Sequence, residues 1–409
     1  MFKRILSLLT ACVLIVVSCE RNTAPLQPEQ NTKAIVLSPQ EAHLVASTNR
    51  FSFELFRQVC QASPEEANVF ISPFSASMAL GMALNGASGQ TYQAIRSTLD
   101  LTDLQPDSIN ALFRHLYDQL QNLDPQVNFK IANSIWYDEK FPVLPDFIDV
   151  NRRYFEATVQ ALNFADTSAV SVINHWVNLH TQGKIPKIIN HIDRDEVLFL
   201  LNALYFDGQW QYAFDAQQTK QETFYGFTGN TTCHMMYAQY AFPYYVSSKL
   251  QVVQLPYGSG QFRMVLILPE ILPDFIDSLS FGGWQNMLQQ CQTDQAVLKM
   301  PKFSFSYGLM LNEILKNMGM AVAFTPDADF SRISSDQSVF ITRVVHKAFV
   351  ETNEQGTKAA AVTNIGFGRA NGNPGPKTIT FNRPFLFFIY EKSSNTILFM
   401  GKIVKPVVE

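Results

Sequence analysis

The sequence predicts one large domain that mixes α-helices with β-strands. Apolar residues recur at helical spacing in some stretches, and in others they form short runs on either side of turn residues, as in strands. The 409 residues are enough for two or three domains, but no Pro/Ser-rich linker and no block of charge divides them. The 33 phenylalanines can supply a sizeable core.

Four stretches have the periodicity of helices that bury one face. Glycine follows two of them, Gly86 after the second stretch and Gly319 after the last, and glycine commonly ends a helix. The predicted helices are Leu44–Cys60, Met78–Leu84, Val172–His180 and Leu311–Met318.

Strand patterns are clearest in two places. The runs Val252–Leu255 and Phe262–Leu268 flank the turn Y-G-S-G-Q and predict a hairpin. A second pattern begins at Val345, where Phe349 and Val350 continue a buried strand.

The segment that follows this strand has no clear local preference. Alanine favours helix, whereas threonine and valine favour strand. Gly356 in front of the segment is suited to a hinge, and the Gly- and Pro-rich residues 366–376 behind it predict an exposed loop. If the segment became a strand, one face would be uniformly small, with Lys358 on the other. The small face would hold Thr357, Ala359, Ala361 and Thr363.

Several long motifs, in order from about residue 38 to the end, resemble the serpin family. The sequence E-x-G-T-x-A-A-A-x-T from Glu354 resembles the hinge of the serpin reactive loop. The other motifs are N-V-F-I-S-P-F-S-A-S from Asn68, G-A-S-G-Q-T from Gly86, L-N-A-L-Y-F-D-G-Q-W from Leu201, F-N-R-P-F-L-F-F-I-Y from Phe381 and I-L-F-M-G-K-I from Ile397.

The resemblance implies an α+β serpin fold. Such a fold has a large central, mostly antiparallel β-sheet, two smaller sheets and about eight to nine helices. A single serpin domain would span residues 38–409, with an exposed reactive-centre loop at about 354–377. The helix Val172–His180 would lie across the main sheet.

The resemblance also implies a function, that of a suicide inhibitor of serine proteases rather than an enzyme. The target protease cuts the exposed loop and forms an acyl-enzyme. Before water hydrolyses the ester, the loop inserts into the central sheet as an extra strand and distorts the enzyme, whose catalysis requires accurate geometry. The hinge residues matched by the motif are Glu354, Gly356, Thr357, Ala359, Ala360, Ala361 and Thr363.

The bond that the protease cuts depends on how the loop is counted. Counting from the hinge glycine as in typical serpins places it between Ala370 and Asn371 and indicates an elastase- or subtilisin-like target. The alternative bond, between Arg369 and Ala370, suits a trypsin-like protease. Counting backward from F-N-R-P-F gives Asn373, and Phe367 would suit a chymotrypsin-like enzyme.

Three other functions remain open. A non-inhibitory serpin would be a binding protein or a substrate, but such serpins tend to carry bulky, charged or proline residues in the hinge, and the inward face of this hinge has none through Thr363. The same trap works with a thioester, so papain-like cysteine proteases are a second target class. A lipid-anchored binding module with no protease role is the third. Gln355, where serpins more often carry a charge, is a mild departure.

Four polar residues, Ser72, Ser75, Asn202 and His346, lie inside apolar segments. Buried polar groups need partners, and these four can satisfy one another. In serpins the matching positions form a cluster under the middle of the large sheet, where strands part; a purely structural core cluster is the alternative. Trp210 matches the tryptophan at the top of the sheet, where insertion begins, although a strand tryptophan is also typical of core packing.

The first residues are typical of an export signal. Basic residues precede the apolar run Ile5–Val17, which is too short to span a membrane. The run ends V-V-S-C and resembles a bacterial lipoprotein signal, in which residues 1–18 are removed and Cys19 carries lipid; an ordinary signal peptide is the alternative. Residues 19–37 would form a flexible tether. We therefore expect anchoring to a bacterial outer membrane, on its periplasmic or cell-surface face.

Composition and motifs argue against several other classes. A net charge of −4 without basic runs argues against nucleic-acid binding. The chain has no H-E-x-x-H and no G-x-S-x-G, so we expect no catalytic centre, metal or cofactor. Leu99–Leu123 contains only Arg114 as a basic residue, so no heparin-like site is indicated. We therefore expect the binding partner to be a protease. The chain itself is expected to be a monomer, with loop–sheet polymers as the alternative.

Cys60, Cys233 and Cys291 are expected to be buried free thiols.

Overall fold

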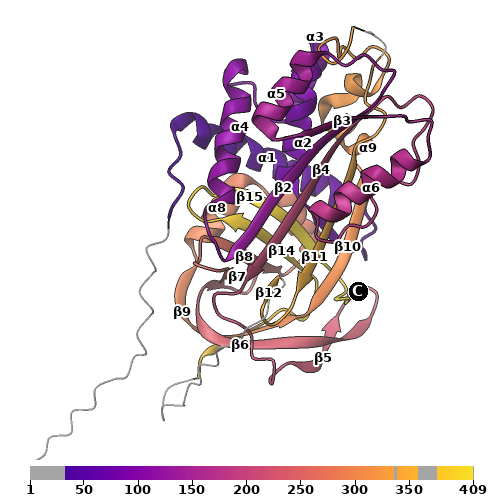
Figure 1. Ribbon diagram of the computed structural model, residues 1–409. Coiled ribbons are helices and arrows are strands. Elements are labelled where there is room, and N and C mark those ends of the chain that lie inside the picture. The colour runs from indigo at the N-terminus through magenta and orange to yellow at the C-terminus, as the bar shows by residue number, and fades with distance from the viewer. Residues whose placement is uncertain (1–32, 336–338, 358–374, 409) are drawn as a thin grey trace, which may run out of the picture. The chain divides into compact units, whose positions relative to one another are not determined.

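The computed structural model describes residues 33–335, 339–357 and 375–408, which belong to one compact unit. The fold class is α+β, with nine α-helices among these residues and strands in three sheets (Figure 1). The helices are α1 (Pro39–Ala62), α2 (Pro73–Gly86), α3 (Gly89–Thr98), α4 (Pro106–Gln121), α5 (Pro145–Phe155), α6 (Ser168–His180), α7 (Leu272–Ser278), α8 (Phe281–Gln289) and α9 (Asn312–Leu315).

The largest sheet has nine strands. Its order is β1 (Val69–Ile71), β15 (Ile397–Ile403), β14 (Phe385–Glu391), β8 (Phe262–Pro269), β7 (Leu250–Pro256), β6 (Asn230–Val246), β9 (Gln292–Pro301) and β13 (Lys377–Thr380), with β5 (Lys220–Tyr225) also paired to β6. All of its pairs are antiparallel except that of β13 with β9.

The two smaller sheets have four strands and two. The first has the order β12 (Gly356–Thr357), β4 (Leu198–Gln209), β2 (Val127–Asp138) and β3 (Thr158–Leu162), and only the β2–β3 pair is parallel. The second pairs β10 (Phe303–Met310) with β11 (Val345–Thr352).

Strands β4 and β11 lie next to each other, so these two sheets continue one another in a single layer (Figure 1). Within the part of the chain that the structure describes, no backbone ladder joins the two strands; β12 alone pairs with β4 on that side. We call the space between them the β4/β11 gap. It divides the central sheet that the sequence predicts.

The predicted helices and the hairpin are confirmed, with one boundary corrected. Helix α1 begins at Pro39, a residue type common in the first turn of a helix, and Ser38 is its N-cap. The Ser38 Oγ accepts the Glu41 N–H at 3.3 Å, and the Glu41 carboxylate accepts the Ser38 N–H at 2.7 Å. Helix α9 covers only Asn312–Leu315 instead of Leu311–Met318. A π-helical turn (Lys316–Met320) follows, and it contains Gly319, whose φ of 111° is one that glycine adopts without strain.

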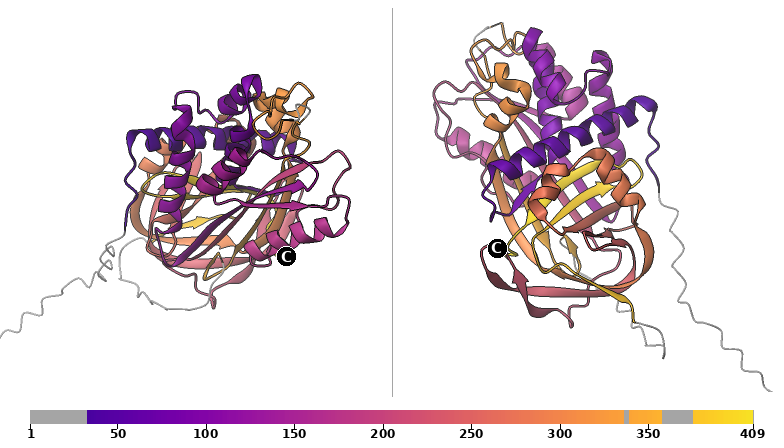
Figure 2. Two further views of the ribbon diagram at one scale, coloured as in Figure 1. Left: turned by 45° about the horizontal axis from the view of Figure 1, so that its top comes forward. Right: turned by 180° about the vertical axis from the view of Figure 1, so that it is seen from behind.

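Aromatic side chains fill the core on both faces of the nine-stranded sheet. The Phe70 ring stacks on Phe387 and Phe399, at centroid distances of 5.6 and 5.2 Å. Phe56 of α1 meets Phe388 edge-on at 5.5 Å. Seen from behind, α1 runs along the C-terminal strands (Figure 2). This half of the molecule is therefore closely packed.

Helix α6 covers one face of β2 and β4, as predicted. Ile173, Trp176 and Val177 of α6 form a separate apolar cluster with Trp136 of β2 and Phe199 of β4. Helix α2 contacts β4 as well, through Ser75 and Asn202.

The thiol prediction needs one correction. Among the described cysteines Cys60, Cys233 and Cys291 are all free, and the first two are buried. Cys291 is only half-buried because it lies at the boundary between α8 and β9 instead of inside the core.

Gly401→Ala should destabilise the uncleaved chain by about 1–3 kcal/mol. A Cβ at this position would lie 2.2 Å from the Phe387 ring, which is locked in the aromatic stack. Urea unfolding followed by tryptophan fluorescence should show a lower midpoint at unchanged slope. Gly282→Ala is the matched control, because a Cβ there meets nothing within 4 Å and should cause no loss of stability.

Candidate functional site

The hinge residues enter the β4/β11 gap at one end. Gly356 and Thr357 pair antiparallel with Gln209 and Gly208 of β4. Only glycine fits at position 356, because its φ is 150° and a Cβ would lie 2.2 Å from the Gly208 carbonyl oxygen. The hinge glycine thus brings two backbones into close contact. The buried Thr357 shares a hydrogen bond of 2.9 Å with the hydroxyl of Tyr257.

Trp210 holds the turn in front of these two residues. Its backbone N–H donates to the Gln355 carbonyl and its indole N–H to the Asn353 carbonyl, both at 2.9 Å. The indole stacks on Tyr257 at a centroid distance of 4.4 Å. Trp210 therefore packs in the core and also contacts the hinge residues. Its interpretation as a core residue and its interpretation as a hinge contact are compatible. The Gln355 backbone takes part in the turn through its N–H to the Asn353 side chain.

Glu354 fixes the same turn electrostatically. Its carboxylate lies 2.8 Å from the Lys302 ammonium and accepts the Thr219 hydroxyl at 3.0 Å. Its carbonyl accepts the Phe214 N–H at 2.8 Å. Burial would raise the pKa of Glu354, but the bonds from Lys302 and Thr219 outweigh it and leave this pKa below its ordinary value. Sequence reasoning missed Lys302, Thr219 and Tyr257, which give no local signal.

The four predicted polar residues come together halfway along the gap. The His346 Nε2 on β11 accepts the Ser72 N–H at 3.1 Å, and the Ser72 Oγ accepts the Ser75 N–H at 3.2 Å. The Ser75 hydroxyl then donates to Asn202 on β4. These bonds connect the strands on both sides of the gap through the start of α2. We call these four residues the polar cluster.

Asn133 on β2 extends the polar cluster, although the sequence analysis did not predict it as a member. It accepts the Asn202 side-chain N–H at 2.6 Å and donates to the Phe155 carbonyl at 2.6 Å. The signal was available, because Asn133 and Ser134 are polar residues within the otherwise apolar run Ile131–Trp136 of this strand. A buried polar group in such a strand requires partners.

Burial keeps His346 neutral. It lowers the pKa of this imidazole from 6.5 to about 4, because the cationic form would lose its hydration. Since Nε2 accepts the Ser72 N–H, the ring proton of the neutral form is on Nδ1.

The segment that follows α6, residues 181–193, covers the gap on the α6 face. Gln182 accepts the Tyr205 hydroxyl of β4 at 2.9 Å, and Lys184 forms an ion pair of 2.6 Å with Glu351 of β11. The Lys184 ammonium also lies 4.5 Å from the centre of the Phe349 ring. One short segment thus contacts both strands.

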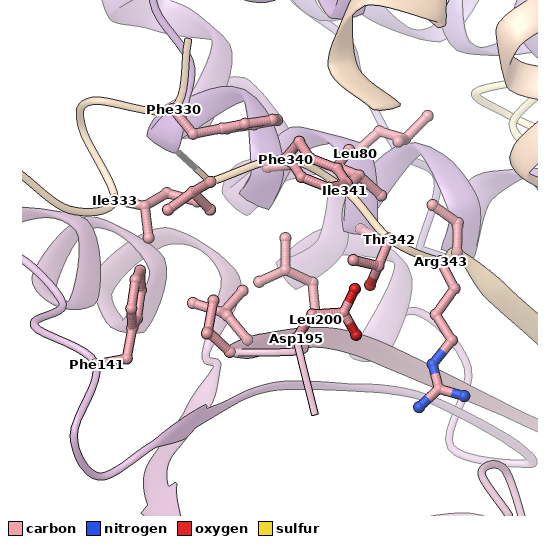
Figure 3. Close-up of a pocket in the computed structure, with 16 residues that line it drawn as sticks. Leu80, Phe141, Asp195, Leu200, Phe330, Ile333, Phe340, Ile341, Thr342 and Arg343 are labelled. Atoms are coloured by element: carbon pink, nitrogen blue, oxygen red, sulfur yellow. The ribbon is translucent and has the colours of Figure 1, made fainter. Parts of the chain in front are cut away.

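A cavity of about 320 Å³ occupies the end of the gap away from the hinge (Figure 3). Its walls come from α2, from the start of β4 and from residues 339–344, which lead into β11. Most of the side chains that line it are apolar, among them Leu80, Phe141, Leu200, Phe330, Ile333 and Phe340. The gap is therefore not filled by its own side chains at this end.

Several predicted residues lie outside the described part of the chain. These are Ala359, Ala360, Ala361 and Thr363 of the hinge, Arg369, Ala370 and Asn371 at the reactive bond, and Cys19.

No group of three or more His, Cys, Asp or Glu side chains in the described ranges is arranged to hold a metal ion. Across the same ranges, none of the helices has the length and apolar character needed to span a membrane.

Comparison with known proteins gives a consistent result. Residues 46–406 match the family model "Serpin (serine protease inhibitor)". An uncharacterized serpin-like protein of Thermococcus kodakarensis is 32% identical over 375 residues, which are 90% of this chain and 87% of that protein. The corticosteroid-binding globulin of Saimiri sciureus is 32% identical over 98% of this chain and 99% of its own length. The crystal structure of the thermophilic serpin Tengpin in its native state superposes with a TM-score of 0.82 at 30% identity, covering 91% of this chain and 96% of Tengpin.

The neutral His346 predicts a loss of stability in acid. The unfolded chain takes up a proton near pH 6.5, whereas the folded chain does so only near pH 4. This contribution is therefore complete above pH 6.5 and is lost as the pH falls toward 4, and by pH 5 it has decreased by about 2 kcal/mol relative to pH 7.

Urea unfolding of the uncleaved chain at pH 7 and pH 5 measures this decrease. His346→Gln should make the difference between the two pH values smaller by about 2 kcal/mol. The exposed His175→Gln is the control and should leave the difference unchanged. An equal pH dependence in all three proteins would show that His346 is not the titrating group.

Proposed function

The chain belongs to the serpin family, and from this premise we propose that it inhibits serine proteases by inserting its cleaved loop into the β4/β11 gap. Serpins are generally protease inhibitors rather than enzymes, although the family also includes binding proteins such as the corticosteroid-binding globulin. The observation that carries the proposal is the hinge strand β12, which already occupies the first positions of the gap.

The register of β12 indicates how a longer insertion would run. In this antiparallel pairing each further loop residue meets the preceding residue of β4, starting from Thr357 opposite Gly208. Six residues further on, Thr363 would meet Asn202 in the polar cluster. Phe367 would then meet Leu198, one of the residues that line the cavity.

The side chains of the loop suit this path. The inward positions up to Thr363 are small, so they pass the polar cluster without a bulky clash. At the far end the cavity provides room for the larger Ile365 and Phe367, which would come opposite Leu200 and Leu198. The same count brings Arg369 opposite Glu196, a residue of opposite charge.

Insertion would give partners to backbone groups that no strand pairs within the described residues. The backbone N–H and C=O groups on the facing edges of β4 and β11 would gain partners from the new strand. Each hydrogen bond contributes about 0.5–1.5 kcal/mol net, so a strand of a dozen residues gains on the order of 10 kcal/mol. This gain would drive the trap.

The chemistry belongs to the target protease. Its serine attacks the carbonyl of Ala370 in the first register, or of Arg369 in the alternative one, and the amine of the next residue leaves as the new N-terminus. Insertion then competes with hydrolysis of the ester. A papain-like protease would form a thioester in the same way.

We further propose that Cys19 carries a lipid that anchors the chain to a bacterial outer membrane, on its periplasmic or cell-surface face. The export signal that ends V-V-S-C supports this part of the proposal. Residues 19–37 would tether the inhibitor to the membrane.

Covalent complex formation tests the inhibitory function. The chain without residues 1–19 is mixed with trypsin, and separately with pancreatic elastase, and analysed on denaturing gels and by mass spectrometry. We expect a band of summed mass and a C-terminal peptide that begins at Asn371 with elastase or Ala370 with trypsin. Cleavage without any complex, for serine and papain-like proteases alike, and without a gain in thermal stability would refute inhibition.

Thr357→Arg tests the insertion step in the same assay. Thr357 is buried against Tyr257, so a long cation there should slow insertion and let the ester hydrolyse. An increase of only about 1.4 kcal/mol in the insertion barrier changes the ratio of complex to cleaved product about tenfold. Gln355→Arg is the control, because this half-buried side chain belongs to the turn ahead of the inserting strand.

Cys19→Ser tests the anchor. In a bacterial host the full chain should fractionate with outer membranes, and the variant should lose its lipid and leave the membrane fraction. Mass spectrometry of the N-terminal peptide should find a diacylglyceryl group on Cys19. An unlipidated Cys19, or an N-terminus that starts elsewhere, would favour an ordinary signal peptide.

A further inference from the structure

A buried ion pair spans the β4/β11 gap at the end away from the hinge. Arg343, just before β11, places its Nη2 atom 2.5 Å from the Oε2 of Glu196, just before β4. The Arg343 Nε atom lies 2.5 Å from Oε1 but is not aligned as a hydrogen-bond donor. The side chain of Glu196 is only 2% exposed and that of Arg343 only 11%.

Glu196 has partners on both sides of the gap. On its own side, Oε2 accepts the N–H of Asp193 at 2.7 Å. On the other side, Oε1 accepts the hydroxyl of Thr342 at 3.2 Å, in addition to the contacts with Arg343. Arg343 also donates to the His191 carbonyl at 2.7 Å. A carboxylate buried this deeply is stable only while these partners stay in place.

The backbone around Arg343 is held from the side away from Glu196. The Val344 carbonyl accepts the Leu311 N–H at 2.9 Å, and the Val344 N–H donates to the Asn312 side chain at 2.8 Å. The Ile341 N–H donates to the Ala323 carbonyl at 2.9 Å. Because no ladder joins β4 to β11 in the described ranges, side chains connect the two segments here.

We propose that Glu196, Thr342 and Arg343 form a latch that holds this end of the gap closed and sets the rate of the last stage of loop insertion. A strand that reaches this end must separate residues 196 and 343. The latch therefore opposes insertion at its far end, while the hinge favours it at the near end. These are positioning residues and take no part in the covalent chemistry.

Hydrogen exchange of the full chain in mild detergent tests the latch without any protease. Glu196→Gln removes the charge at nearly constant shape, and Arg343→Met removes the cation. Both should raise exchange about tenfold in peptides that cover 197–202 and 339–346, through easier local opening. Peptides that cover 205–210 and 352–357, at the hinge end, should not change.

A double variant and a control sharpen this test. Because Glu196 and Arg343 act together, the double variant should exceed either single variant by less than twofold. Glu313→Gln breaks the exposed ion pair between Glu313 of α9 and Lys316 of the π-helical turn and should change neither region. Arg343→Lys keeps the charge and should lie between wild type and Arg343→Met. If Glu196→Gln does not fold, Arg343→Lys and Arg343→Met still provide the comparison.

The insertion rate is the second readout, and it rests on the proposed function. The loop is cut with a protease that forms no complex, and the gain in thermal stability is followed with time. Glu196→Gln and Arg343→Met should gain stability about tenfold faster than wild type. A residue with a merely structural role would lower the stability of the uncleaved chain and leave this rate unchanged.

The outcomes separate the two proposals. If cleaved wild type never gains stability, the proposed function fails, and hydrogen exchange alone then decides on the latch. If exchange at 197–202 and 339–346 does not differ between wild type and the variants, the latch is refuted. If exchange rises but wild type and variants insert at one rate, the latch closes the gap without limiting insertion, and the proposal is overturned in that part.

Discussion

The facing edges of β4 and β11 are the constraint on which the rest of this structure depends. The two strands lie in one layer, and within the described residues no ladder joins them. Apart from the two β4 residues that pair with β12, their backbone groups on that side therefore have no strand partner among these residues. The surroundings hold the two edges in place by other means. The hinge occupies one end and the Glu196 ion pair closes the other. In between, the polar cluster lies on the α2 face and residues 181–193 lie on the α6 face.

The contacts across the β4/β11 gap are individually weak, and they are of a different kind from the contacts in the rest of the molecule. The nine-stranded sheet and α1 are joined by the packing of Phe53 and Phe56 against Phe388, and these rings cannot separate without exposing apolar surface. The gap is bridged mainly by single hydrogen bonds and ion pairs, each of which can break on its own. A net hydrogen bond is worth only about 1 kcal/mol, so a complete new ladder outweighs several of them together. The fold thus combines a half packed through aromatic rings with a layer in which two neighbouring strands are connected mainly by polar side chains.

Electrostatics decides how firmly the layer is closed. The polar cluster works with a neutral His346, because burial disfavours the imidazolium that would otherwise disrupt the bond to Ser72. At the two ends the connections are charged, with Glu354 paired to Lys302 and Glu196 paired to Arg343. A buried charge pair adds little net stability, but removing one partner is costly. Such pairs are suited to holding one arrangement of the two segments in place.

The sequence by itself determined the α+β class, the main helices, the hairpin and the residues of the polar cluster, because each depends on local periodicity or on polar residues placed within apolar runs. The reactive bond and Cys19 stay predictions, since the structure does not describe these residues. Only the tertiary structure decided that no ladder joins β4 to β11 within the described residues, that Tyr257 and Lys302 support the hinge, and that Glu196 meets Arg343. The physical reason is distance along the chain: these partners are about 50 to 150 residues apart, and no local pattern encodes a contact between segments that meet only after folding.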